Sequence, residues 1–102
     1  MKYTEFENCG LKKSLDMISG KWNPLILYHL FHRGNYRFNE LWQTIPKVSK
    51  KVLTKHLRQL EENGLIERKE IQGFPPRTSY NLSNKGKKLG PILKDLDDFG
   101  NS

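Results

Sequence analysis

The sequence contains a single cysteine, Cys9, in 102 residues. One thiol cannot form a disulfide within the chain, so we exclude the disulfide-stapled folds of secreted proteins and expect a reducing, cytoplasmic compartment. Long apolar runs are absent too, because no stretch reaches the roughly 18 residues that a membrane-spanning helix needs. The opening residues, MKYTEFENCG, lack the apolar core of a secretory signal. We therefore expect no membrane partner.

Motifs for catalysis and metal binding are missing as well. We find no phosphate-binding loop of the form GxxxxGK followed by Ser or Thr, no nucleophile–base pair and no supported pair of catalytic carboxylates. His29 and His32 stand three positions apart without a third ligand nearby, and His56 is expected to pack at the edge of a helix. These absences predict a protein that is not an enzyme and has no metal site and no cofactor.

Acidic residues are scarce relative to basic ones, with 11 Asp and Glu against 18 Lys and Arg. The formal net charge of +7 at pH 7 favours a polyanionic partner. The length of 102 residues fits one domain with a small core, and we take residues 1–102 as that domain.

The most informative stretch is RFNELWQTIPKVSKKVLTKHLRQLEENGLIERK, residues 37–69. At about 100° per residue, Leu53, Leu57 and Leu60 fall on one side of a helix. The other side and the first turn carry the candidate DNA-binding residues Ser49, Lys50, Lys51, Thr54, Lys55 and Arg58. A solvated surface helix is the alternative, but a short helix before it and a hairpin after it favour a recognition helix in a DNA major groove.

The remaining elements follow from caps, spacing and turn residues. Ser49 is a suitable N-cap for the basic helix, Asn63-Gly64 ends it, and Pro91 should kink or split the last helix. The predicted fold class is α+β, mainly α: a winged helix-turn-helix domain with terminal helices that form a dimer interface. We expect the following elements: helices 9–18, within 21–32, from Asn39 to Pro46, 49–63 and 83–99; a turn at 33–35; a short strand at 36–37; and strands 65–71 and 77–82.

The apolar stripe of the last helix is longer than so small a core can cover. An uncovered apolar helix edge invites association, so a second copy of the chain is the simplest cover. The candidate dimer-interface residues on this helix are Leu89, Ile92, Leu93, Leu96 and Phe99.

The hairpin supplies a second candidate contact with DNA. Arg77 follows Pro75-Pro76 near the tip, with Thr78 beside it, and an arginine here could enter a narrow minor groove. The alternative is that Arg77 only pairs with an acid such as Glu70. Arg37 begins the third helix and could bind either a phosphate or a neighbouring acid.

Three segments of the chain resemble the HxlR-type branch of the MarR-like winged helix-turn-helix transcription regulators. They are CGLKKSLDMISGKWNPLILYHL, the stretch 37–68 and PPRTSYNLSNKGKKL. The resemblance implies a bacterial homodimer that binds double-stranded DNA, with a helix-turn-helix at about 38–64, a wing at about 65–82 and dimerisation helices at about 9–19 and 83–99. On the first helix, the dimer interface that the resemblance implies would use Leu11 and Leu15. We expect a repressor on a pseudo-palindromic operator. Two departures from the family are Gly10, where proline is common, and the short segment after Phe99.

Cys9 stands at the N-terminus of the first helix, where the helix dipole stabilises a thiolate. Lys12 and Lys13 add positive charge within about one turn. Some members of the resembled family sense oxidants or electrophiles at this position, so Cys9 is a candidate redox switch; an inert interface thiol is the alternative. Oxidation could give a bond between two Cys9 residues, a mixed disulfide or an adduct.

A winged helix can also serve as a protein–protein module that never reads DNA. Such a module would show apolar anchors on the outer side of the basic helix, whereas this chain has Lys, Thr and Arg there. The sequence therefore favours DNA, and it leaves the operator and any small-molecule effector open.

Overall fold

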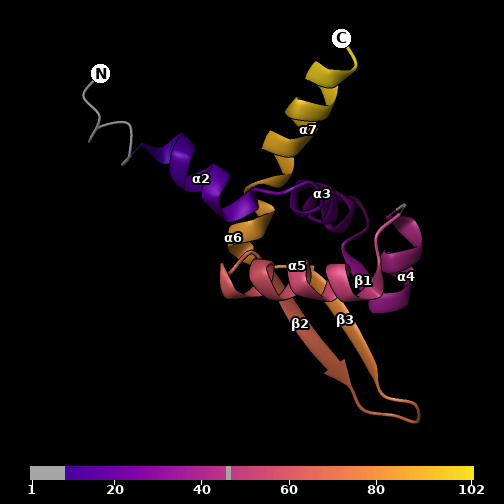
Figure 1. The fold of residues 1–102 in the computed structure, drawn as a ribbon. Helices are drawn as coiled ribbons and strands as arrows, with labels where there is room; N and C mark the ends of the chain where they lie inside the picture. Colours follow the sequence, from indigo (N-terminus) through magenta and orange to yellow (C-terminus); the bar gives the residue numbers. More distant parts are fainter. Residues whose placement is uncertain (1–8, 46) are drawn as a thin grey trace.

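The computed structural model describes residues 9–45 and 47–102, and it has a mainly helical α+β winged helix-turn-helix fold (Figure 1). Its elements are α2 (Gly10–Ile18), α3 (Asn23–Arg33), β1 (Asn35–Arg37), α4 (Phe38–Thr44), α5 (Lys50–Glu62), β2 (Ile66–Ile71), β3 (Arg77–Leu82), α6 (Asn84–Lys87) and α7 (Gly90–Gly100).

Helix α3 is the central helix of the core, as its apolar sequence predicts. Ile26, Leu27 and Leu30 are fully buried, and Pro24 is tolerated in the first turn because that turn needs no backbone donor. The helix ends at Gly34, whose φ of 95° favours glycine. The other buried side chains of the core come from helices, strands and the segments between them: Ile18, Tyr36, Leu41, Ile45, Val48, Leu53, Leu57, Leu60, Leu65, Ile66, Tyr80, Leu82 and Leu93.

The helix-turn-helix is formed by α4 and α5. Helix α4 begins at Phe38, one residue before the predicted start, and Pro46, which was expected to end it, lies outside the described residues. The predicted N-cap of α5 is confirmed, since the Ser49 hydroxyl accepts the Val52 N–H at 3.1 Å. The predicted end is confirmed as well: Gly64 has a φ of 74°, and the Leu65 N–H donates to the Leu60 carbonyl.

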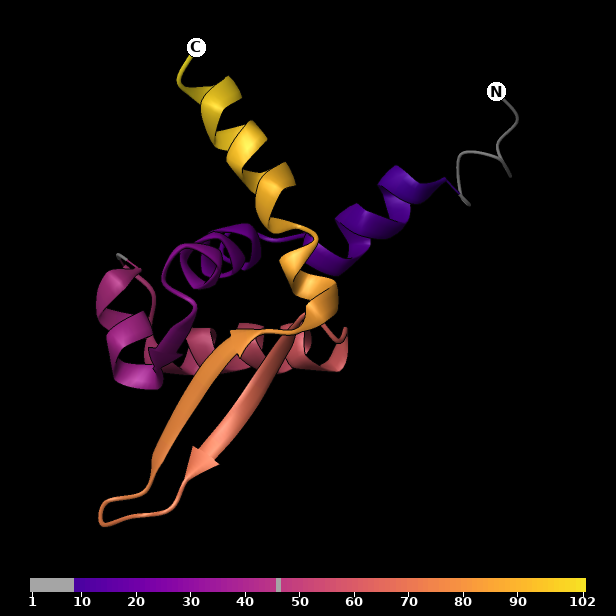
Figure 2. The same cartoon turned by 180° about the vertical axis from the view of Figure 1, so that it is seen from behind.

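The three strands form an antiparallel sheet in the order β1-β3-β2. The register places Tyr36 opposite Tyr80, and Ile66 opposite Leu82. Strand β1 includes Asn35, which we had expected in the preceding turn. Beyond the core, β2 and β3 continue as a free hairpin, the wing (Figure 2).

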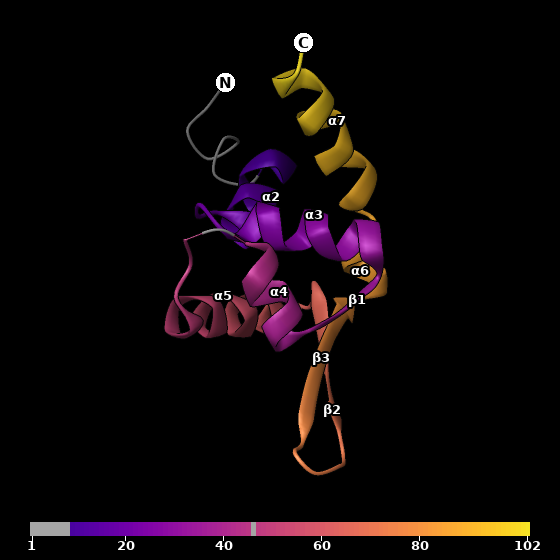
Figure 3. The same ribbon diagram turned by 90° about the vertical axis from the view of Figure 1, so that its right-hand side faces the viewer.

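The last helix is split into α6 and α7, as predicted; the break lies at residues 88–89, and Pro91 stands in the first turn of α7. Two glycines let these helices approach the body closely. A Cβ atom on Gly86 would lie 2.0 Å from the Leu65 carbonyl oxygen, and one on Gly90 would lie 2.1 Å from the Phe31 ring. Helices α2 and α7 leave the body at the end opposite to the wing (Figure 3), and the chain spans 56 × 31 × 25 Å.

Candidate nucleic-acid interface

The outward side of α5 carries the predicted basic surface. Lys50, Lys51, Lys55 and Arg58 are exposed, whereas Leu53 and its two inner partners are buried. These four cations and Thr54 line one shallow hollow along the helix. The only acid among the residues that line it is Glu62, at the far end. The N-terminal half of α5 therefore presents positive charge to its surroundings.

Local contacts fix three side chains in the first turns of α5. The Lys50 ammonium lies 4.7 Å from the centre of the Trp42 ring, which ties it to α4. Thr54 donates its hydroxyl proton to the Lys50 carbonyl at 2.8 Å, so its methyl group and oxygen lone pairs remain for a partner. Ser49 uses its oxygen as the cap and keeps its hydroxyl proton for donation.

The wing places Arg77 and Thr78 at the start of β3, both on the exposed part of the hairpin. Glu70, the acid that could have paired with Arg77, forms an ion pair with Arg68 at 2.7 Å instead. Within residues 9–45 and 47–102, no ion pair engages Arg77. Its charge is therefore available to an outside anion.

Arg37 lies near the base of the wing. A hollow of about 510 Å³ is bordered by Arg37 on one side and by Arg77 and Thr78 on the other. The neighbouring acid, Glu40, accepts the backbone N–H of Arg37 at 2.9 Å and pairs with the Arg33 guanidinium. These two contacts, in that order, lower the pKa of Glu40. Arg37 thus gives its backbone to the acid, while its exposed side chain faces the hollow shared with Arg77.

Two further residues of this surface were missed in the sequence. The first is Arg68, which lines a hollow of about 370 Å³ between the wing and α5 together with Arg58, a predicted residue. Hydrogen bonds to Tyr80, opposite on β3, and then to Glu70, on the same strand, raise the pKa of Arg68, and no spacing in the sequence shows the cross-strand partner. Phe74 at the wing tip is fully exposed, at 104 % of its reference area. The loop QGFPP could have indicated it, because an apolar residue there has no core to join.

The predicted dimer-interface residues fall into two groups. Leu11, Leu15, Ile92, Leu96 and Phe99 are between 51 % and 72 % exposed. Leu93, by contrast, is 5 % exposed and belongs to the core of its own chain, and Leu89 packs against that core. The apolar surface left for a partner is therefore formed by the first five.

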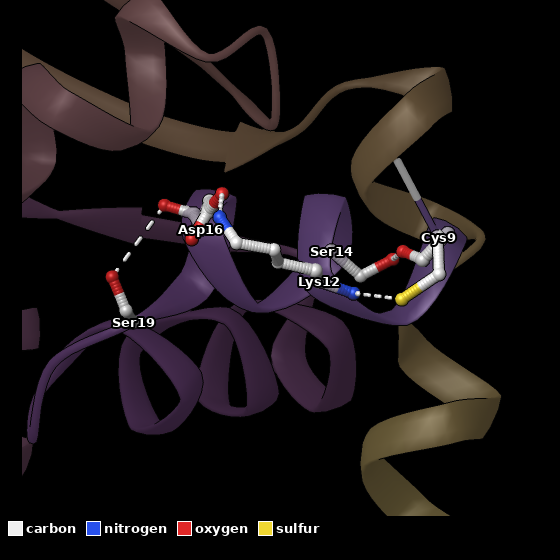
Figure 4. Close-up of polar contacts among 6 residues, drawn as sticks. Cys9, Lys12, Ser14, Asp16 and Ser19 are labelled. Atoms are coloured by element: carbon white, nitrogen blue, oxygen red, sulfur yellow. Dashed lines mark hydrogen bonds and ion pairs between the residues drawn. The ribbon is translucent and has the colours of Figure 1, made fainter. Parts of the chain in front are cut away.

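Cys9 is the N-cap of α2, as predicted (Figure 4). Its Sγ accepts the backbone N–H of Lys12 at 3.4 Å, and the residue is half-buried. The Lys12 ammonium is paired with Asp16 at 3.0 Å, one turn farther along the helix. The thiol thus sits at the positive end of α2.

The described residues contain no group of three or more His, Cys, Asp or Glu side chains arranged to hold a metal ion. Burial lowers the pKa of His29, with a smaller contribution from His32. Among the described helices, none is long and apolar enough to cross a membrane.

Comparison with known proteins identifies the family. The family model HxlR-like helix-turn-helix matches residues 17–102. YdeP of Bacillus subtilis (strain 168), an uncharacterized HTH-type transcriptional regulator, is 40 % identical over 96 residues, which cover 94 % of this chain and 74 % of YdeP.

Solved structures agree with this family. A protein of Porphyromonas gingivalis W83 assigned to the MarR family of transcriptional regulators superimposes with a TM-score of 0.87 at 37 % identity, covering 92 % of this chain and 91 % of that one. The redox regulator HypR in its reduced form gives a TM-score of 0.86 at 33 % identity, covering 91 % of each chain. The chain therefore belongs to the HxlR-like helix-turn-helix family of transcriptional regulators, which are not enzymes.

Proposed function

We propose that this regulator is a homodimeric repressor that binds a pseudo-palindromic operator with α5 in the major groove. The observation that carries the proposal is the division of α5 into a fully buried leucine side and an exposed cationic side. A helix held in this way can enter a groove without giving up any core contact.

The contacts divide by position along the helix and wing. Ser49, Lys50, Lys51 and Thr54 lie in the first turns of α5, where base edges come within reach. Lys55 and Arg58 lie farther along and serve phosphates, as does Arg37 at the wing base. Arg77, with Thr78 beside it, reaches the adjacent minor groove.

A second copy of the chain would cover the exposed apolar side chains of α2 and α7. Leu11 and Leu15 contribute from α2, and Ile92, Leu96 and Phe99 contribute from α7. Because these helices leave the body opposite to the wing, a dimer formed through them leaves both α5 helices and both wings free for one duplex.

Selection from a random pool of duplex DNA with the purified protein tests this function. We expect enrichment of an inverted repeat whose half-sites lie about one helical turn apart. Affinity should fall with salt at a log–log slope near −0.9 for each neutralised phosphate. Absence of any enriched sequence, with a folded protein, would favour the alternative of a protein–protein module.

A redox switch at Cys9 is the second candidate, favoured by the half-buried thiol at the N-cap of α2 and by the likeness to HypR. In the dimer, two Cys9 thiols would form one disulfide and give up two protons and two electrons to an oxidant such as diamide, which is reduced to its hydrazine.

The matched pair for this switch is the wild type and Cys9→Ser, each treated with diamide. A non-reducing gel should show a covalent dimer for the wild type alone, together with a change in operator affinity. If the oxidant changes the affinity of both proteins equally, or of neither, Cys9 is an inert thiol.

A further inference from the structure

The recognition helix is joined to α3 by a polar contact at the edge of the apolar core. Asn23, the first residue of α3, is 3 % exposed, and its Oδ1 lies 2.9 Å from Nδ1 of His56 on α5. Its Nδ2 donates to the carbonyl of Ser19, the residue that ends α2, at 2.9 Å. One buried amide therefore joins the end of α2 to the DNA-reading helix.

These contacts fix the protonation of the imidazole. Since Nδ2 of Asn23 donates to Ser19, its Oδ1 must accept, and Nδ1 of His56 must carry the proton. Asn23 is buried, so leaving its Oδ1 without a donor is costly, and this favours the contact with His56.

Two neighbouring contacts join the same elements. The loop from α2 to α3 passes over His56: a Cβ on Gly20 would lie 3.6 Å from the imidazole Cε1. At the other end of α5, the Asn63 amide donates to the Met17 carbonyl near the end of α2 at 3.4 Å. The end of α2 and the loop that follows it thus lie beside His56 on α5 and beside Asn63, the residue that caps α5.

His56 stands between the two sides of α5, because Lys55 precedes it on the DNA side and Leu57 follows it in the core. The apolar contacts of the leucines alone tolerate small rotations of α5 about its axis, whereas a hydrogen bond is directional. Holding His56 therefore sets the roll of α5 about its own axis, and with it the direction of the neighbouring cations.

We propose that Asn23 is a positioning residue for DNA recognition: through His56 it sets the roll of the recognition helix and links that roll to the end of α2. The proposal rests on the proposed DNA-binding function. Its consequence is that a displacement of α2, the helix that carries Cys9, is felt by α5 through Asn23.

Operator affinity in a double-mutant cycle tests the link, at a temperature where circular dichroism shows every variant folded. Asn23→Ala and His56→Ala should each weaken binding roughly tenfold, and the double variant should bind about as weakly as either single variant. His56→Gln, whose amide can donate in place of Nδ1–H, should restore most of the affinity. Asn23→Ala combined with Arg58→Ala should show additive losses, because these residues do not touch.

Additive losses in the Asn23–His56 pair would overturn the proposal. So would an Asn23→Ala protein that melts earlier but binds the operator with wild-type affinity, because Asn23 would then only stabilise the fold. A wild-type protein that binds no DNA contradicts the proposed function instead.

The state of the imidazole offers a readout that needs no DNA. Nitrogen NMR of the wild type should show the Nδ1–H form of His56, and Asn23→Ala should change it to the Nε2–H form. An Nε2–H imidazole in the wild type would overturn the link in any case.

Discussion

The two ends of the molecule expose different kinds of side chain. The wing and outer α5 expose cations, of which Arg77 has no ion-pair partner within the described part of the chain. The ends of α2 and α7 expose leucine, isoleucine and phenylalanine side chains instead. Each surface matches one kind of partner: a polyanion for the first and an apolar surface for the second. Under the proposed function, the molecule would therefore bind DNA at one end and a second copy of the chain at the other.

The largest expected effect comes from breaking the apolar end. Leu96→Asp should give a monomer, because a buried carboxylate without a partner opposes association. Since two linked half-sites bind far more tightly than one, operator affinity should fall about 100-fold.

Analytical ultracentrifugation and a gel shift measure the two effects. Lys94→Ala is the control, since it removes only an exposed ion pair with Asp98 on the same helix. A Leu96→Asp protein that stays dimeric would place the interface elsewhere.

A smaller effect is expected at the cationic end. Lys51→Ala should weaken operator binding about tenfold, the lower range for loss of a specific base contact. The oligomeric state should not change, which separates this end from the other. Fluorescence anisotropy measures the affinity, and Lys87→Ala on α6 serves as the matched control. Equal affinities for the two variants would remove Lys51 from the interface.

The wing tip should matter less for affinity and more for the shape of the DNA. Phe74→Ala removes a side chain with no folding contact, so the melting temperature should stay unchanged. If the apolar tip presses into the minor groove, affinity should fall about fivefold and the induced bend should decrease. Circular-permutation gel shifts measure the bend, with Phe74→Leu as the variant that keeps an apolar wedge. A bend unaltered in Phe74→Ala would confine the wing contact to its cations.

The smallest effect concerns pH and belongs to neither end. Burial lowers the pKa of His29 in the folded state below its unfolded value, and it lowers the pKa of His56 in the same way. The unfolded chain therefore binds more protons as the pH falls, and stability present above the unfolded pKa, about 6.5, is lost below it. The melting temperature should drop slightly between about pH 7 and pH 5. His29→Gln should show a smaller drop in the same titration.

The features that depend on local sequence could be predicted. The spacing of Leu53, Leu57 and Leu60 gave the buried side of α5, Ser49 gave its start, and Gly64 gave its end. Each depends on residues within a few positions of one another, so periodicity and cap chemistry are sufficient.

The features that depend on tertiary geometry could not be predicted. Leu93 lies in the core while Leu96, one turn later, is exposed, because the angle at which α7 crosses α3 decides which leucines are covered. The hairpin register places Arg77 opposite Ile71 and Thr78 opposite Glu70, so Glu70 pairs with Arg68 on its own strand rather than with Arg77. The contact between Asn23 and His56 joins residues 33 positions apart, and no pattern in the sequence links them.

If the chain dimerises through α7, as proposed, the close approach of Gly90 to Phe31 affects which operators the dimer binds. Helix α7 turns away from the body at this point and then runs for 11 residues, roughly 16 Å at 1.5 Å per residue. Because the helix is this long, a small tilt at its base displaces its far end by several ångströms. If the partner docks there, the distance between the two reading helices is set by a glycine that lies against one aromatic ring. Gly90→Ala, which would place a Cβ 2.1 Å from the Phe31 ring, would then change the half-site spacing without altering any of the proposed DNA contacts.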